Sequence, residues 1–451
     1  MSEEKDIPKH WRVKKLGEVC KLKNGYAFKS DHYESIGVPV IRISDINEGI
    51  VSSGKAVRVK PIDEYENYLV ENNDILVAMS GATTGKFGVY KSTEKAYQNQ
   101  RVGKFRILDE NILNNEFLYH QINSLKRQIE KDAYGGAQPN ISSAKIEQMQ
   151  IVLPPLPEQQ AIVAKIEELL SDLENGKQQL QTAQQQLKVY RQSLLKWAFE
   201  GKLTNKNVKE GELPKGWKWV KLGEVLDFVG SGVTPKGGQS VYKTSGVVFL
   251  RSQNVYPNKL ELDDVAFITD EIDERMKRTR VKPNYVLLNI TGASIGRSAF
   301  VPPNLSRANV NQHVCILRAN QQLLDCAFLS SYLNSPQAQS EIMNTQSGAT
   351  RQGLNFQQIR NIEIPFPPIK GQQLIVDELE SKLTVCDKIE ETISHSLQQA
   401  ETLRQSILKK AFEGKLVTQN PNDEPASKLL GRIKAESAKS EVKKKNPEGM
   451  T

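Results

Sequence analysis

The chain has 451 residues, of which 38% are hydrophobic and 25% are charged, and its formal net charge is +8. These values predict a folded, soluble protein of about three domains, and the positive charge permits a polyanionic partner without requiring one. No apolar run approaches the ~20 residues of a membrane helix, and the first residues, MSEEKDIPKHW, contain no secretory signal. The four scattered cysteines have no CxxC pair and no histidine at ligand spacing, which argues against a zinc site or disulfide framework and favours a reducing cytoplasm.

Residues 1–152 predict a compact α+β unit. They contain the sequence PKHWRVKKLGEV at residues 8–19 and then three short β-branched runs, VPVIRISDI, DILVAM and RVGKFRIL, which are expected to form strands. Residues 115–131 carry apolar side chains at helical spacing, so a helix should pack against these strands.

Residues 153–204 predict a long helix, because apolar residues recur at alternating steps of four and three, as in a heptad seam. Pro157 suits a first helical turn, and Gly201 suits a C-terminal cap. About 40 residues would make a helix of ~60 Å, and an apolar stripe this narrow needs a partner to cover it. The seam residues expected to pair are Ile162, Ile166, Leu173, Leu180, Leu187 and Leu194.

Residues 205–365 predict a second unit built like the first. PKGWKWVKLGEV at residues 214–225 repeats the earlier opening, and SGATTGKFGVY at residues 80–90 corresponds to TGASIGRSAFV at residues 291–301. The runs VVFLRSQNV, YVLLNI and HVCILRA are expected to be strands, and residues 325–343 have helical spacing.

Residues 366–417 repeat the first long helix without a gap. The offset is 366 − 153 = 213 residues, and 21 of the 51 compared positions are identical. A gapless repeat indicates that length is constrained, so each copy is expected to pair with the other; a generic dimerisation segment is the alternative. A basic tail over residues 418–451 is expected to be flexible. The second seam should use Ile375, Leu379, Ile389, Ile393, Leu403 and Ile407.

A glycine-rich loop, Gly81-Ala-Thr-Thr-Gly-Lys86, is similar to a phosphate-binding loop but lacks one residue of GxxxxGK and is followed by Phe87. Nucleotide binding is therefore not expected. Two interpretations stay open: a turn that brings backbone amides and a cation close to a DNA phosphate, or a tight structural turn with an exposed Lys.

No catalytic or metal site is predicted. The five histidines stand singly, and His313 aligns with Arg101, so the two units share no reactive residue there. GxSxG, HExxH and the Asn-Pro-Pro-aromatic signature of amino-methyltransferases are all missing from the sequence. A duplicated architecture of this kind is more typical of binding than of catalysis.

Cations beside the duplicated loops are the candidate DNA contacts, because Arg binds guanine bidentately and both Lys and Arg bind phosphates. A surface charge or a structural ion pair is the competing interpretation, above all for Arg42 and Arg251 in strand-like runs. Asn99-Gln100 and Asn311-Gln312 could read adenine edges or make buried hydrogen bonds. The candidate cations are Lys23, Lys29, Arg42, Lys86, Arg101, Lys236, Arg251, Arg297 and Arg351.

Over roughly residues 8–417, the chain resembles the specificity subunit of type I restriction–modification enzymes. The resemblance rests on Pro-Pro and Gln-Gln at the start of each long helix, on Arg-Gln-Ser near its end, and on the closing Ala-Phe-Glu-Gly-Lys-Leu at residues 198–203 and 411–416. The WxxxKLGEV motif is similar to the start of a target-recognition domain. One departure is Lys370-Gly371, where the first copy has Pro157-Glu158.

The resemblance implies an α+β fold in which two mixed α/β target-recognition domains alternate with two long helices that pair as an antiparallel coiled coil with pseudo-two-fold symmetry. Each domain would read one half of an asymmetric bipartite DNA target. The helices would fix the spacing and hold two methyltransferase subunits, which restriction subunits then join. S-adenosylmethionine, ATP and Mg are expected on those partners, with no cofactor in this chain. The alternatives are a coiled-coil scaffold that reads no DNA, or a nuclease or methyltransferase activity hidden in one unit.

Overall fold

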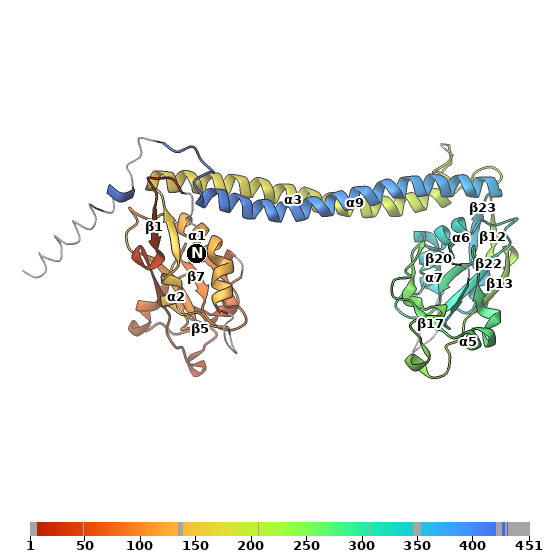
Figure 1. The fold of residues 1–451 in the computed structure, drawn as a ribbon, viewed down its shortest axis with the longest axis horizontal. Helices are drawn as coiled ribbons and strands as arrows, with labels where there is room; N and C mark the ends of the chain where they lie inside the picture. The colour runs from red at the N-terminus through yellow and green to blue at the C-terminus, as the bar shows by residue number, and fades with distance from the viewer. Residues whose placement is uncertain are drawn as a thin grey trace, which may run out of the picture. The chain divides into compact units, whose positions relative to one another are not determined.

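The computed structural model describes residues 7–47, 49–133, 139–205, 207–305, 307–345, 353–420, 426–428 and 431. The chain divides into two compact units: unit 1 is Met1–Gln178 with Leu397–Thr451, and unit 2 is Gln179–Ser396. Each unit contains one globular domain, one part of helix α3 (Leu156–Phe199) and one part of helix α9 (Ile369–Phe412) (Figure 1). Most of the basic tail expected to be flexible lies outside the described residues.

The globular domain of unit 1 contains a five-stranded sheet of order β2-β10-β7-β8-β4 and a four-stranded sheet of order β5-β3-β9-β6. A separate ribbon pairs β1 (Arg12–Lys15) with β11 (Gln150–Leu153), so the first and last strands lie together. The three runs predicted as strands are confirmed in β3, β7 and β10. Besides the β1–β11 ribbon, the helices and strands of this domain are β2 Cys20–Asn24, β3 Val38–Ile41, β4 Gly49–Val51, β5 Val57–Val59, β6 Leu69–Val70, β7 Ile75–Ala78, β8 Phe87–Tyr90, β9 Ala96–Gln98, β10 Val102–Ile107, α1 Asn115–Ala133 and α2 Ser143–Glu147.

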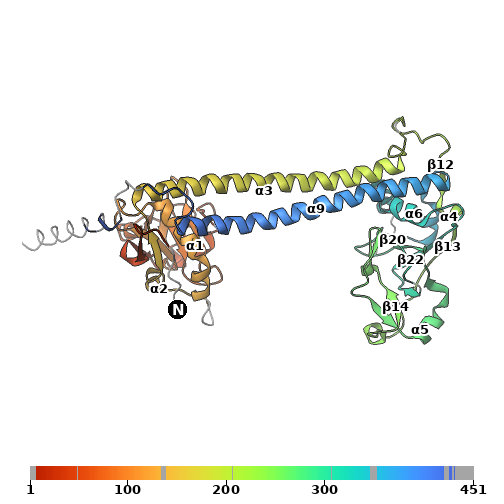
Figure 2. The same ribbon diagram turned by 45° about the horizontal axis from the view of Figure 1, so that its top comes forward.

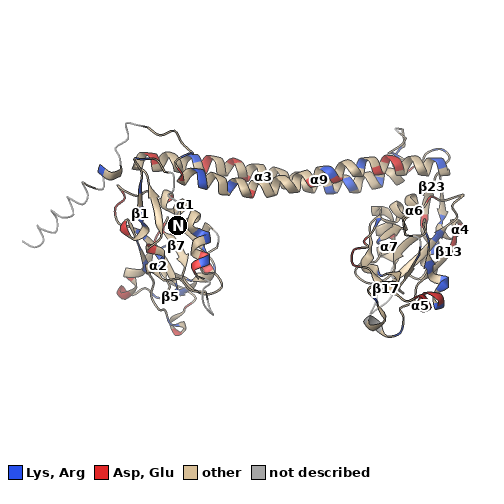
Figure 3. Ribbon diagram, viewed as in Figure 1, with Lys and Arg blue, Asp and Glu red and all other residues tan. Residues whose placement is uncertain are grey.

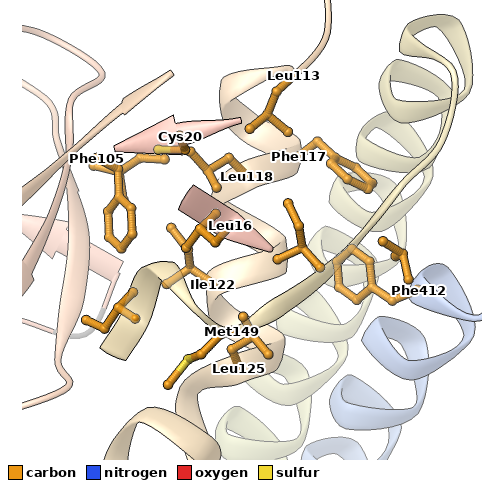
Figure 4. Packing of buried hydrophobic residues seen from close by; sticks show 14 of the residues in the cluster. Leu16, Cys20, Phe105, Leu113, Phe117, Leu118, Ile122, Leu125, Met149 and Phe412 are labelled. Atoms are coloured by element: carbon orange, nitrogen blue, oxygen red, sulfur yellow. The ribbon is translucent and has the colours of Figure 1, made fainter. Parts of the chain in front are cut away.

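Strand β7 is apolar throughout because both of its faces are covered. Ile75 and Val77 belong to the core that includes α1, whereas Leu76 and Ala78 belong to the core shared with the second sheet. This alternation follows from the two-residue period of a strand. On the α1 side, Phe117 packs edge-on against Phe412 of α9, with ring centroids 5.7 Å apart (Figure 4).

The domain of unit 2 repeats this plan with sheets of order β13-β22-β19-β20 and β17-β14-β21-β18 and a ribbon of β12 with β23. The three runs predicted as strands in this unit are likewise confirmed, in β14, β19 and β22. The bounds are β12 Lys218–Lys221, α4 Leu222–Val225, β13 Leu226–Ser231, β14 Val247–Leu250, β15 Val255–Tyr256, β16 Lys259–Leu260, β17 Ala266–Ile268, α5 Asp270–Arg275, β18 Arg280–Val281, β19 Val286–Asn289, β20 Ser298–Phe300, β21 Ala308–Val310, β22 Val314–Ala319, α8 Phe356–Asn361 and β23 Glu363–Phe366.

The helical spacing of residues 325–343 is confirmed, and the structure divides this stretch into two helices, α6 (Cys326–Leu333) and α7 (Pro336–Thr345). The break falls at Asn334, whose side-chain amide donates to the carbonyl oxygens of Ser298 and Ser330, both at 2.8 Å. Pro336 has no N–H to donate and therefore suits the first turn of the new helix.

Within each unit the two long helices lie side by side and antiparallel (Figure 2). In unit 1 the beginning of α3 packs against the end of α9, since Ile162, Ile166 and Ile407 share one core. In unit 2 the end of α3 packs against the beginning of α9, since Leu194 and Leu379 share another core. In that same unit, Arg191 of α3 forms ion pairs with Asp387 at 2.7 Å and Glu390 at 2.9 Å on α9. This arrangement agrees with the antiparallel pairing that the family resemblance implied.

Two of the predicted seam residues are wrong, because Ile389 and Leu403 are 44% and 52% exposed. The buried positions of α9 do recur every seven residues, at Leu379, Cys386, Ile393, Ala400 and Ile407. Of the residues one position after the predicted intervening positions, Leu383, Leu397 and Arg404 are partly buried and Ala411 is buried, whereas Glu390 is exposed and pairs with Arg191. Leu173 and Leu180 of α3 are only partly buried, and the remaining predicted seam residues are buried.

A buried glutamine fixes the start of each long helix. Gln159 is fully buried, donates through Nε2 to the carbonyl oxygens of Ile112 at 2.7 Å and Pro154 at 3.0 Å, and accepts at Oε1 from the Asn114 N–H at 2.9 Å. Gln372 makes the matching three bonds in unit 2. Helix α9 begins at Ile369, which corresponds to Leu156, so the departure at Lys370-Gly371 leaves the start of the helix unchanged.

A glycine at the end of each long helix contacts the proline that opens a globular domain. Gly414 has φ +72°, and a Cβ placed on it would lie 2.3 Å from Cγ of Pro8. Gly201 has φ +75°, and a Cβ on it would lie 2.1 Å from Cγ of Pro214. Both the left-handed backbone and the close contact therefore require glycine. None of the helices in the described part of the chain is both long and apolar enough to span a membrane.

Candidate nucleic-acid interface

In unit 1, five loop segments are joined by hydrogen bonds at one edge of the globular domain, and we call them the loop cluster. They cover residues 24–29, 41–45, 79–86, 99–101 and 139–141. Five of the bonds run from a backbone N–H to a backbone carbonyl: Asn99 to Ile41 (3.0 Å), Gln100 to Tyr26 (2.7 Å), Met79 to Arg101 (2.9 Å), Ile141 to Met79 (3.0 Å) and Gly81 to Pro139 (3.0 Å). The sixth runs from the Thr83 hydroxyl to the Ile43 carbonyl (3.3 Å).

The glycine-rich loop of this cluster uses three of its backbone amides for hydrogen bonds within its own stretch of chain. Gly81 and Gly85 have φ +84° and +87°, and the N–H groups of Thr84, Gly85 and Lys86 all donate to carbonyl oxygens of residues 78–83. The Thr84 hydroxyl is buried and donates to the Gly81 carbonyl at 2.6 Å. The loop is thus a tight turn with an exposed Lys86, and a contact between this lysine and a DNA phosphate stays a prediction.

Unit 2 has the same loop cluster at equivalent positions. The N–H of Asn311 donates to the Leu250 carbonyl at 3.0 Å, and that of Ile290 donates to the His313 carbonyl at 3.0 Å. Asn289, which is fully buried, takes the place of the threonine link: its Nδ2 donates to the Ser252 carbonyl at 2.8 Å and to Ser294 Oγ at 3.0 Å. Two domains of different sequence thus hold the same set of loops together.

The candidate cations of unit 1 fall into two groups. Arg42 is tied to the buried Asp45: its backbone N–H donates to Oδ2 at 2.8 Å, and its Nε lies 3.7 Å from the same oxygen. This is the structural ion pair that the sequence left as an alternative. Each remaining cation is exposed, and none forms an ion pair within the described ranges; these are Lys23, Lys29, Lys86 and Arg101.

In unit 2 the two arginines lie over aromatic rings. The guanidinium carbon of Arg251 lies 5.6 Å from the ring centroid of Tyr242, and its Nη2 donates to the Asp264 carbonyl at 3.2 Å. The guanidinium carbon of Arg297 lies 5.1 Å from the ring centroid of Tyr256. Lys236 is exposed, and Arg351 lies outside the described residues. Lys, Arg, Asp and Glu are mixed along both domains, so charge alone does not mark the site (Figure 3).

The two Asn-Gln pairs divide their roles in the same way. Asn99 and Asn311 accept through Oδ1 from the backbone N–H two residues ahead, at 3.4 Å and 3.1 Å, which shapes the turn. Gln100 and Gln312 are exposed on the loop cluster. Tyr256 was missed by sequence reasoning, because its partner Arg297 is far away along the chain. Among the described residues, no group of His, Cys, Asp and Glu could hold a metal ion.

The fold therefore has two related binding domains, each followed by a long helix, and known proteins share this plan. The family described as type I restriction modification DNA specificity domain matches residues 8–182 and 214–399. The chain is 30% identical to the specificity subunit of type I restriction enzyme EcoBI from Escherichia coli, across 96% of this chain and 94% of that subunit. It is 25% identical to the EcoKI specificity subunit from Escherichia coli K12, across 97% and 98% of the two chains.

Solved structures have the same fold. The HsdS subunit from Thermoanaerobacter tengcongensis matches with a TM-score of 0.60 and 21% identity, across 91% of this chain and 98% of that one. The chain belongs to the family of type I restriction–modification DNA specificity subunits. Its role is that of the DNA sequence-recognition subunit of such a system, and a scaffold that reads no DNA is not favoured.

Proposed function

We propose that each globular domain reads one half of an asymmetric, bipartite DNA target through its loop cluster. The observation that carries this proposal is the repeated loop cluster with different side chains on it. Lys86 in unit 1 is replaced by Arg297 in unit 2, and Arg101 is replaced by His313. A shared framework with different donors and acceptors suits two half-sites of different sequence.

We propose further that the paired helices fix the spacing between the half-sites. Helices α3 and α9 each have 44 residues, and the repeat between them contains no gap. An insertion of one helical turn in one copy alone would break this match. Equal helix length is therefore expected to set the number of unread base pairs between the half-sites.

The helices are also proposed to dock two modification subunits, the methyltransferases. Tyr190 and Leu403 occupy equivalent places in the two copies (403 − 190 = 213), and both are exposed, at 43% and 52%. An apolar side chain on the surface at both places supports two copies of one partner. In this proposal, restriction subunits join the complex in the cytoplasm, this chain itself is not catalytic, and S-adenosylmethionine, ATP and Mg bind to the partners, which methylate adenine.

A domain exchange tests the proposal. Residues 8–152 are replaced by the corresponding domain of a related subunit, and methylated adenines are mapped in the genome of cells that carry the whole complex. One half-site should change while the other half-site and the gap stay the same. The matched control replaces residues 214–365, which should change the other half-site. A change in both halves from either exchange would disprove independent reading by the two domains.

A further inference from the structure

We infer that Arg297, held over the ring of Tyr256, contacts a guanine in the half-site read by the second domain. The inference rests on the proposed function and goes beyond it in naming one base contact and the residue that positions it. Arg297 is the contact residue, and Tyr256 is a positioning residue.

The contact between Arg297 and Tyr256 leaves the guanidinium donors free. The guanidinium carbon lies 5.1 Å from the ring centroid, and Tyr256 is 44% exposed. In the described part of the chain Arg297 has no ion pair, unlike Arg280 and Arg307 of the same domain, which are both paired with Asp273. Attraction to the face of a ring restrains the guanidinium without using its N–H groups. Those N–H groups can therefore be offered to a ligand.

Both partners are attached to backbone that is firmly held. Tyr256 precedes the turn between β15 and β16, where Asn258 has φ +57° and donates its N–H to the Ser298 carbonyl at 2.8 Å. The Asn258 Oδ1 accepts hydrogen bonds from Ser330 Oγ at 2.9 Å and Asn334 Nδ2 at 3.0 Å. A side chain restrained in this way loses little freedom on binding, which favours a contact of defined geometry.

The backbone of Arg297 is braced from the other side. Its N–H donates to the Ser294 carbonyl at 3.2 Å, and its carbonyl accepts from the Asn289 N–H at 2.9 Å. Because Asn289 also bonds Ser294 Oγ and the Ser252 carbonyl, the Arg297 loop is linked to the loop that leads to Tyr256. The fold thus holds the two backbones from which the ring and the guanidinium extend toward each other.

The first domain lacks both parts of this device. Lys86 stands at the position of Arg297, and Asn47 stands at the position of Tyr256, five residues after Arg42 as Tyr256 is five residues after Arg251. A single ammonium without a ring suits a phosphate of any sequence, whereas a planar fork held in place suits O6 and N7 of guanine in the major groove. The domains therefore differ in the kind of contact made at one shared position, and Lys86 provides a matched control.

The experiment uses the full chain in complex with its methyltransferase subunits. The target is first obtained by selecting bound duplexes from a random pool, and affinities are then measured for every single-base variant of the site. Arg297→Ala should lose the preference for guanine at one position of one half-site, by roughly 5- to 150-fold, and Arg297→Lys should weaken it. Tyr256→Phe should keep this preference, and Tyr256→Asn, the residue of the first domain, should weaken it. Lys86→Ala should lower affinity for all sequences and reduce the salt dependence.

A modified base gives a test that needs no folding control. Replacing that guanine by 7-deazaguanine removes the N7 acceptor, which should weaken binding of the unaltered chain but leave binding of the Arg297→Ala chain nearly unchanged. Arg297 would be a phosphate contact, and the inference overturned, if Arg297→Lys and Arg297→Ala altered only the salt dependence. Equal guanine preference in Tyr256→Asn and the unaltered chain would also overturn it. A complex that selects no bipartite sequence at all would instead refute the proposed function.

Discussion

The buried glutamine at the start of α3 allows a quantitative test of how the long helix is anchored. In Gln159→Met, a side chain of similar size replaces the amide, so packing is largely kept while three hydrogen bonds are lost. Each of those bonds goes to a backbone group: the carbonyls of Ile112 and Pro154 and the N–H of Asn114. Ile112 and Pro154 are buried, so water does not readily replace the lost partner.

A buried polar group left without a partner costs about 1–3 kcal/mol. Three such groups would cost roughly 3–9 kcal/mol, and because Asn114 is only partly buried the lower end applies. We therefore expect Gln159→Met to reduce the free energy of unfolding of unit 1 by about 3–5 kcal/mol. Gln372→Met should cost less, since one of its acceptors belongs to Leu323, which is 45% exposed and open to water.

Urea unfolding of the full chain, with hydrogen exchange of α1 and α3 to identify the unit affected, measures this loss. The neighbouring Gln160 and Gln373 are exposed and provide matched controls. Gln160→Met and Gln373→Met should each change stability by no more than about 0.5 kcal/mol. If Gln159→Met were as mild as Gln160→Met, the reasoning about the anchor would be refuted.

Two further predictions concern α1 and the paired helices. Burial, with a smaller repulsion from Arg404, lowers the pKa of His120 from 6.5 to about 4, so the folded state holds this histidine neutral. Above pH 6.5 the imidazole is neutral in both states and does not oppose folding. As the pH falls from 6.5 toward 4, the unfolded state binds the proton more readily than the folded state, and stability is lost. We expect this group to contribute about 3 kcal/mol of the loss in unfolding free energy between pH 7 and pH 4; urea unfolding at both pH values should show a smaller loss in His120→Phe, and the same loss in both proteins would contradict the assignment. Leu194 is 1% exposed, so Leu194→Ala should lower the free energy of unfolding by about 2–5 kcal/mol. Leu403 is 52% exposed, so Leu403→Ala should lower it by about 0.5 kcal/mol or less. Equal shifts of the thermal unfolding midpoint in the two variants would show that the seam is misplaced.

The duplicated plan could be predicted because repeats and periodicity are local properties of a sequence. The positions of the two long helices and the strands β7 and β19 follow directly from such patterns. The seam of α9 was harder, because sequence reasoning placed it on the apolar residues Ile389 and Leu403, whereas both are exposed and the neighbouring Glu390 and Arg404 are exposed and partly buried, respectively. Helix geometry decides which side of α9 faces α3, and that side cannot be recognised from the sequence where it carries a polar residue.

The loop cluster shows the same limit. The cations beside the duplicated loops could be named from the sequence, but which of them are already paired depends on tertiary contacts. Asp45 pairs with Arg42, whereas the equivalent residue beside Arg251 is the uncharged Asn254. The pairing of Arg297 with Tyr256 joins residues 41 positions apart (297 − 256 = 41), and only the folded chain brings them together.

The contact of Gly414 with Pro8 has a consequence for the gene. The end of α9 contacts the beginning of the first domain at Pro8, and the end of α3 contacts the beginning of the second domain at Pro214. Only α3 and the second domain are joined by a short peptide. A peptide of similar length between residues 417 and 8, with new ends opened near residue 208, would preserve every contact described above. The order in which the two halves are encoded is therefore immaterial to the fold, and a circularly permuted reading frame would yield the same molecule.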